Sequence, residues 1–170
     1  MTAADPKARI SRRYRDHTLI LETSIETSDG AATIVDFMPP RGRASDVVRV
    51  VCGTRGQVSM RTELVIRFDY GSLTPWVSRL GDGTLRAIAG PDMVVLRTPA
   101  SLRGVDFKTV GEFTISAGQT IPFVLTYGAS HLLPPQQIDP AKALAETEAF
   151  WRDGRDIFQI HRFTVRSGGD

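Results

Sequence analysis

Hydrophobic and polar residues alternate most regularly between Gln57 and Gly71, in the run Q-V-S-M-R-T-E-L-V-I-R-F-D-Y-G. Apolar side chains take nearly every second position, and polar side chains take most positions between them. The apolar set is Val58, Met60, Leu64, Ile66 and Phe68, and the polar set is Ser59, Arg61, Glu63 and Arg67. Successive side chains of a strand point to opposite faces of the sheet. The run therefore predicts a β-strand with one buried face.

Similar patterns predict further short strands. They are expected at 17–27, 32–38, 47–52, 84–89, 93–97, 112–116 and 120–127, with another ending near residue 80. Ser28-Asp29-Gly30 predicts a tight hairpin, because Asp-Gly tolerates the positive φ angles of such turns. The segment from Gly53 to Gly56 is interpreted as a turn between two separate strands. Pro122 favours an edge position for the last strand, because it has no backbone donor.

The β pattern stops at His131, and a helix is predicted beyond it. Asp139 can cap this helix, Pro140 suits its first turn, and the helix is expected to run from 141 to 153. Gly154 is expected to end it. Its predicted packing side consists of Leu144, Thr147, Phe150 and Trp151.

Together these elements predict a mainly β fold, an antiparallel β-sandwich of the supersandwich kind with one C-terminal α-helix. We expect three parts: a flexible basic N-terminal arm at 1–13, the sandwich plus helix at 14–153, and a divergent tail at 154–170. Five basic residues crowd into the arm and the two residues that follow it. They are Lys7, Arg9, Arg12, Arg13 and Arg15.

Composition excludes several classes of function. The net charge of the 170 residues is only +2, so we expect no nucleic-acid partner. Cys52 is the single cysteine, which excludes a disulfide framework and a thiolate metal site. The N-terminal sequence lacks the apolar segment of a signal peptide, and no stretch approaches the length of a membrane span. We therefore expect a cytoplasmic protein without a membrane partner.

Motifs for catalysis are absent from the sequence. There is no G-x-S-x-G motif, and the histidines His17, His131 and His161 lie far apart. No paired His or Cys/His spacing is present, so neither a metal site nor a cofactor is expected. Acid–base catalysis by carboxylates stays open. Asp36 and Asp69 are the candidates, because Asp29, Glu63 and Asp92 fit turns or the solvent face better.

Aromatic side chains could stack on sugar rings. Tyr127 and Trp151 are expected to lie in the core, whereas Trp76 follows Pro75 in an irregular segment and is the best exposed candidate. The predicted substrate-binding residues are Trp76, Tyr70 and Asp69, and no catalytic residue is assigned.

Several motifs occur in collinear order from residue 12 to residue 153. They are R-R-Y-R-D-H-T-L-I-L-E-T, T-S-D-G-A-A-T-I-V-D-F-M-P, V-V-R-V-V-C-G-T-R-G, E-L-V-I-R-F-D-Y-G, A-I-A-G-P-D and L-A-E-T-E-A-F-W-R-D. In these motifs the chain resembles the N-terminal β-sandwich of bacterial glycoside hydrolase family 15 proteins. These are glucoamylase-like and trehalase-like enzymes, and the domain is also called the trehalase-like N-terminal domain.

The resemblance implies a non-catalytic domain. In that family the two catalytic glutamates lie on an (α/α)6 barrel that follows the sandwich, and the barrel hydrolyses α-glucosidic substrates such as trehalose or glucooligosaccharides. No position of this chain corresponds to those glutamates. The family's opening segment looks absent before Arg12, and the tail departs from the family after F-W-R-D. We therefore expect a truncated gene product, a split-enzyme subunit or an independent protein.

Partners follow from the same resemblance. The expected partner is an (α/α)6 catalytic domain, or a chain that carries one, and exposed sheet edges would favour self-association. Two alternatives stay open. One is a stand-alone carbohydrate-binding module that uses Trp76 and Tyr70. The other is a small glycoside hydrolase with Asp36 or Asp69 among its carboxylates.

Overall fold

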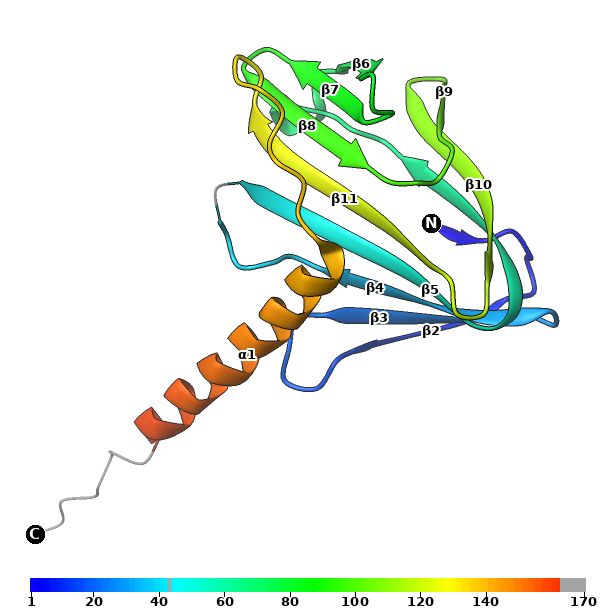
Figure 1. Ribbon diagram of the computed structural model, residues 1–170, viewed down its shortest axis with the longest axis vertical. Coiled ribbons are helices and arrows are strands. Elements are labelled where there is room, and N and C mark those ends of the chain that lie inside the picture. The colour runs from blue at the N-terminus through cyan, green and yellow to red at the C-terminus, as the bar shows by residue number, and fades with distance from the viewer. Residues whose placement is uncertain (43, 163–170) are drawn as a thin grey trace, which may run out of the picture.

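The computed structural model describes residues 1–42 and 44–162, and it describes the side chains of the C-terminal helix as far as Gly154. This part of the chain forms eleven strands, one short 3-10 turn and one α-helix (Figure 1). The elements are β1 (Thr2–Ala3), β2 (Arg9–Tyr14), β3 (Leu21–Glu26), β4 (Gly30–Phe37), β5 (Ser45–Leu64), η1 (Asp69–Gly71), β6 (Trp76–Arg79), β7 (Leu85–Ala89), β8 (Asp92–Arg97), β9 (Arg103–Val105), β10 (Lys108–Ser116), β11 (Thr120–Ala129) and α1 (Pro140–Arg162).

The strands form two antiparallel layers, as predicted for a sandwich. The larger layer has the strand order β2-β3-β4-β5-β11-β8-β7-β6. In the smaller layer, β1 and β10 pair with β5, and β9 pairs with β10. Strand β5 belongs to both layers, because residues 45–52 pair with β11 and residues 57–64 pair with β10.

The predicted turn between two strands at Gly53–Gly56 is wrong, since β5 runs through it. The backbone packs too closely here for a side chain: a Cβ at Gly53 would lie 2.0 Å from the carbonyl oxygen of Ser116. A Cβ at Gly56 would lie 2.0 Å from that of Asp29, and Gly56 has a φ of +54°. The glycines therefore allow β5 to pass from one layer to the other without ending.

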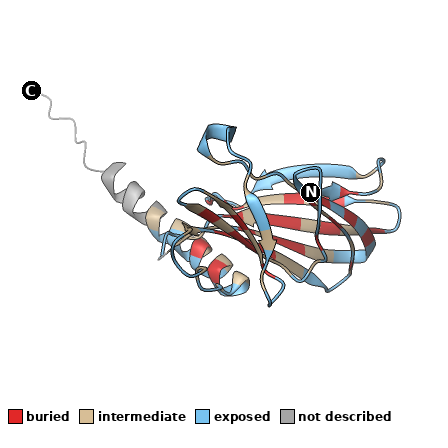
Figure 2. Cartoon of the chain, turned by 90° about the horizontal axis from the view of Figure 1, so that it is seen from above, coloured by how far each residue is buried: buried red, intermediate tan, exposed pale blue. Residues whose placement is uncertain are grey.

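Two hydrophobic cores lie on the two faces of the larger layer. The inter-layer core lies between the layers, and the helix-side core lies under α1. Figure 2 shows buried positions along the strands and on the helix. The inter-layer core contains Ala3, Ile25, Ala32, Ile34, Val51, Val58, Met60, Leu96, Leu102, Ile115 and Phe123. The helix-side core contains Ile20, Val35, Phe37, Val48, Val50, Val124 and Ala143, with Cys52 packed against it.

The helix begins as predicted but ends later. The amides of Ala141 and Lys142 donate to Oδ1 of Asp139 at 2.9 and 3.3 Å, which is an N-cap. Gly154 does not end the helix, which continues to Arg162. A C-terminal capping glycine takes a positive φ, and Gly154 does not.

The packing side of α1 was predicted only in part. Thr147 is buried, and Leu144 packs against the helix-side core. Phe150 is 51% exposed, so its predicted packing is wrong. Figure 1 shows that the C-terminal part of α1 extends beyond the sheet.

The segment 1–13 contains strands where the sequence predicted a flexible arm. Residues 2–3 form β1, and β2 pairs along its whole length with β3. Every residue of β2 is exposed, so this edge strand has no buried face and no apolar period that the sequence could reveal.

Pro122 does not lie on an edge strand, because β11 pairs with both β5 and β8. The pairing with β8 begins only at Val124. At Pro122 the strand has only β5 as a neighbour. The missing N–H of Pro122 therefore costs no backbone hydrogen bond on the other side of β11.

Candidate functional site

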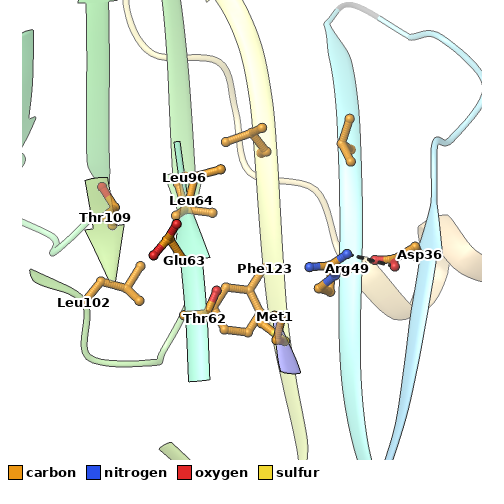
Figure 3. Close-up of a pocket in the computed structure, with 12 residues that line it drawn as sticks. Met1, Asp36, Arg49, Thr62, Glu63, Leu64, Leu96, Leu102, Thr109 and Phe123 are labelled. Atoms are coloured by element: carbon orange, nitrogen blue, oxygen red, sulfur yellow. Dashed lines mark hydrogen bonds and ion pairs between the residues drawn. The ribbon is translucent and has the colours of Figure 1, made fainter. Parts of the chain in front are cut away.

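The inter-layer cleft contains one of the predicted carboxylates, Asp36. The cleft has a volume of about 230 Å³ and is lined by apolar side chains that include Leu96, Leu102 and Phe123 (Figure 3). Arg49 donates from Nε to Oδ1 of Asp36 at 2.6 Å and from Nη2 to Oδ2 at 2.9 Å. Both carboxylate oxygens are therefore engaged in a bidentate ion pair.

Glu63 lines the same cleft and is also paired. The ammonium group of Lys108 lies 3.0 Å from Oε1 of Glu63. General acid catalysis needs a carboxyl group whose pKa is raised. In the part of the chain whose side chains are described, two carboxyl groups have clearly shifted pKa values, Glu22 and Asp82, and both are shifted the other way. Hydrogen bonds from Arg15 and from the Thr84 amide, respectively, are the main causes that lower their pKa.

Asp69 and Tyr70 lie on η1, the turn that leads towards β6. Both have positive φ angles, 48° and 52°. The hydroxyl of Ser72 donates to Oδ2 of Asp69 at 2.9 Å, so this carboxylate holds the turn. Tyr70 is fully exposed. Their predicted role in substrate binding stays a prediction.

Trp76 lies in a groove at the same corner of the molecule. The groove separates β6 and β7 from the β9–β10 hairpin, and its volume is about 320 Å³. Trp76 lines one side and Phe107, at the tip of the hairpin, lines the other; each is 81% exposed. Neither Asp69 nor Tyr70 lines this groove. We call this feature the aromatic groove.

Two arginines hold the walls of the aromatic groove. Arg79 donates to the carbonyl oxygens of Gly83 at 3.0 Å and Leu102 at 2.7 Å, which links β6 to the segment before β9. Arg67 donates to the carbonyl oxygens of Ile66 at 2.7 Å and Phe107 at 3.4 Å. The hairpin tip is thus tied to the chain that follows β5.

Phe107 is the groove residue that the sequence did not predict. The tip of the hairpin, Val-Asp-Phe-Lys, contains no glycine, proline or asparagine, so Asp106 is its single turn-favouring residue and the turn signal is weak. Asp106 and Phe107 both have positive φ angles, 48° and 58°.

The two aromatic residues expected in the core lie elsewhere. Tyr127 is 49% exposed, which corrects the prediction. Its hydroxyl donates to Oδ1 of Asp92 at 2.5 Å, and this hydrogen bond raises the pKa of Tyr127. Trp151 is half-buried and stacks edge-on against Phe150, with ring centroids 5.4 Å apart.

No group of three or more His, Cys, Asp or Glu residues within 1–42 and 44–154 could hold a metal ion. His17 and His131 are exposed, and the His161 side chain lies outside the described part. None of the helices in the described part is long and apolar enough to cross a membrane.

Comparisons with known proteins do not identify a family for this chain. No family model matches the chain, and no curated protein does. Two chains of solved structures match it. One is titled "Putative kojibiose phosphorylase from human microbiome"; it shares 11% identity and a TM-score of 0.43, over 87% of this chain and 23% of that one. The chain thus spans about a quarter of the length of that protein.

Proposed function

We propose that this chain is a non-catalytic β-sandwich domain that packs against a catalytic (α/α)6 barrel of the family 15 glycoside hydrolase type. The barrel would hydrolyse α-glucosidic bonds, as in trehalose or glucooligosaccharides. The proposal rests on the collinear motifs between residues 12 and 153, which carry the resemblance to that family.

The bidentate Asp36–Arg49 pair is the observation that favours a non-catalytic role. Glycoside hydrolysis needs two carboxyl groups across a sugar site, one as acid and the other as base or nucleophile. In the inter-layer cleft, Asp36 and Glu63 are each neutralised by a basic side chain.

The end of α1 supports a role in packing against a partner. The helix extends past the sheet in Figure 1. Its half-exposed Phe150 stacks on Trp151. A half-exposed aromatic ring on a helix is the kind of surface that a second domain buries.

The test has two arms. The purified chain alone should release no glucose from trehalose or maltotriose. Mixed with a family 15 barrel that lacks its own sandwich, it should form a one-to-one complex in analytical ultracentrifugation and raise the thermal stability of the barrel.

Steady turnover by the isolated chain would contradict the non-catalytic role. Turnover that is lost in Asp36→Asn would favour the small-hydrolase alternative instead. If the chain neither binds the barrel nor changes its stability, the supporting role is wrong.

A further inference from the structure

We propose that the aromatic groove is a binding site for a neutral pyranose sugar, with Trp76 and Phe107 as its stacking surfaces. This site belongs to the chain itself, so it goes beyond the supporting role and does not depend on a barrel. Its ligand class is a disaccharide or a short oligosaccharide, because the groove is too small for a long chain of sugars to be enclosed.

The shape and lining of the groove support a small ligand. A volume of about 320 Å³ falls at the lower end of the roughly 300–1,000 Å³ that small-molecule sites occupy. Trp76 on β6 and Phe107 at the tip of the β9–β10 hairpin are each 81% exposed. Large exposed aromatic rings provide flat apolar surfaces, and the C–H face of a pyranose stacks on such surfaces.

The hairpin tip holds Phe107 in an unusual backbone conformation. Asp106 and Phe107 have φ angles of 48° and 58°. Two-residue turns of this kind normally use Asn-Gly or Asp-Gly, because the left-handed region costs other residues about 1–2 kcal/mol each. An aromatic residue in place of glycine is expected where its ring contributes to function.

Polar groups surround the rings without forming an anion site. Lys108 is paired with Glu63 at 3.0 Å, and Arg79 already donates to two backbone carbonyl groups. Asp106 and Arg103 are exposed on the hairpin and line the groove. One acceptor and one donor of this kind suit sugar hydroxyl groups, whereas a phosphate group is typically held by several free cations.

Binding can be measured through the tryptophan in the groove. The chain has two tryptophans, Trp76 and Trp151. In the variant Trp151→Phe, Trp76 alone reports, and titration with maltotriose or trehalose should change its emission saturably. For a small, open site we expect a Kd on the order of 1 mM.

Variants locate the site. Phe107→Ala should weaken binding about tenfold, as expected for one lost stacking contact, and Phe107→Tyr should retain it. Leu133→Ala is the matched control, because Leu133 is 89% exposed but does not line the groove. Trp76→Ala should abolish the heat of binding in calorimetry, which needs no fluorescent reporter.

Three results would overturn the proposal. They are no saturable binding of either sugar, equal binding by wild type and Phe107→Ala, and binding that disappears at moderate salt, which would indicate a charged ligand. If Phe107→Ala changes only the oligomeric state, the groove is a protein contact instead. Because the isolated chain is titrated, failure here would leave the barrel-supporting function untouched.

Discussion

The two halves of β5 are parts of one strand in two different environments. In residues 45–52, Val48 and Val51 are both fully buried, one in the helix-side core and the other in the inter-layer core. In residues 57–64, Met60 is buried but its neighbours Ser59 and Arg61 are exposed. The first half is covered by α1 on one face and, around Val51, by the smaller layer on the other, whereas the second half has one face in solvent. A continuous apolar run therefore indicates a strand segment that is covered on both faces, and a strict alternation indicates a segment that is covered on one face.

The largest difference in stability between the two halves is expected when a charged side chain is introduced. Val51→Lys and Val48→Lys each place an ammonium group in a core, and we expect neither variant to fold. The penalty of about several kcal/mol per buried ion is comparable with a total stability of roughly 5–15 kcal/mol. Ser59→Lys should change the free energy of unfolding by less than about 0.5 kcal/mol. Urea titrations followed by circular dichroism measure all three, and a folded Val51→Lys would show that the first half is not covered on both faces.

The bend between the halves should be the next most sensitive point. Gly56→Ala combines a Cβ clash with the carbonyl oxygen of Asp29 and a φ of +54°, so we expect a loss of about 3 kcal/mol. Gly118 is the matched control, since it has a φ of +80° but nothing within 4 Å of its Cβ position. Gly118→Ala should cost only about 1–2 kcal/mol. Equal losses in the two variants would mean that close packing at the bend is unimportant.

Local sequence patterns predicted the strands but not how they connect. The alternation around Val58 and Met60 is confirmed, because both are buried. The link between the halves was predicted as a turn because glycine serves both turns and close backbone approaches. Only the contact with Ser116, which lies 63 residues after Gly53 (116 − 53), distinguishes the two.

The sequence also predicted only a part of the candidate site. Trp76 was expected to be exposed, and it is. Phe107 was missed, because its exposure depends on a hairpin whose turn has only a weak sequence signal, Asp106. Tyr127 was assigned to the core from its two-residue period with Phe123 and Leu125. The period is correct, but the smaller layer does not extend far enough to cover it.

An ion network at the edge of the larger layer should stabilise the packing of α1 over the first half of β5. Arg15 hydrogen-bonds both Glu22 on β3 and Glu148 on α1, and thereby ties the helix to the larger layer. The hydrogen bond from Arg15 is the main cause that lowers the pKa of Glu22 below 4.5. We expect Glu22→Gln to lower the free energy of unfolding at neutral pH by about 1–2 kcal/mol.

This contribution should depend on pH in one direction. A carboxyl group with a lowered pKa in the folded state stabilises the fold above its unfolded pKa, and the stabilisation is lost as the pH falls through the folded pKa. The difference between wild type and Glu22→Gln should therefore be full above about pH 4.5, the ordinary value, and shrink in more acidic solution. Glu26→Gln, on the same strand but 58% exposed, is the control. A difference that grows towards acidic pH would contradict this assignment.

Two ion pairs, one beside each half of β5, should show the smallest energetic effects. They compare the electrostatic environments of the two halves directly. Asp36–Arg49 is bidentate, with side chains 22% and 37% exposed, whereas Glu63–Lys108 is a single contact with both side chains 44% exposed. Double-mutant cycles to alanine should give a coupling energy near 1 kcal/mol for the first pair and about 0.2–0.5 kcal/mol for the second. Added salt should reduce the second coupling more, because screening acts most on exposed charges. Equal couplings with equal salt dependence would mean that the environments of the two halves differ in packing alone and not in their electrostatics.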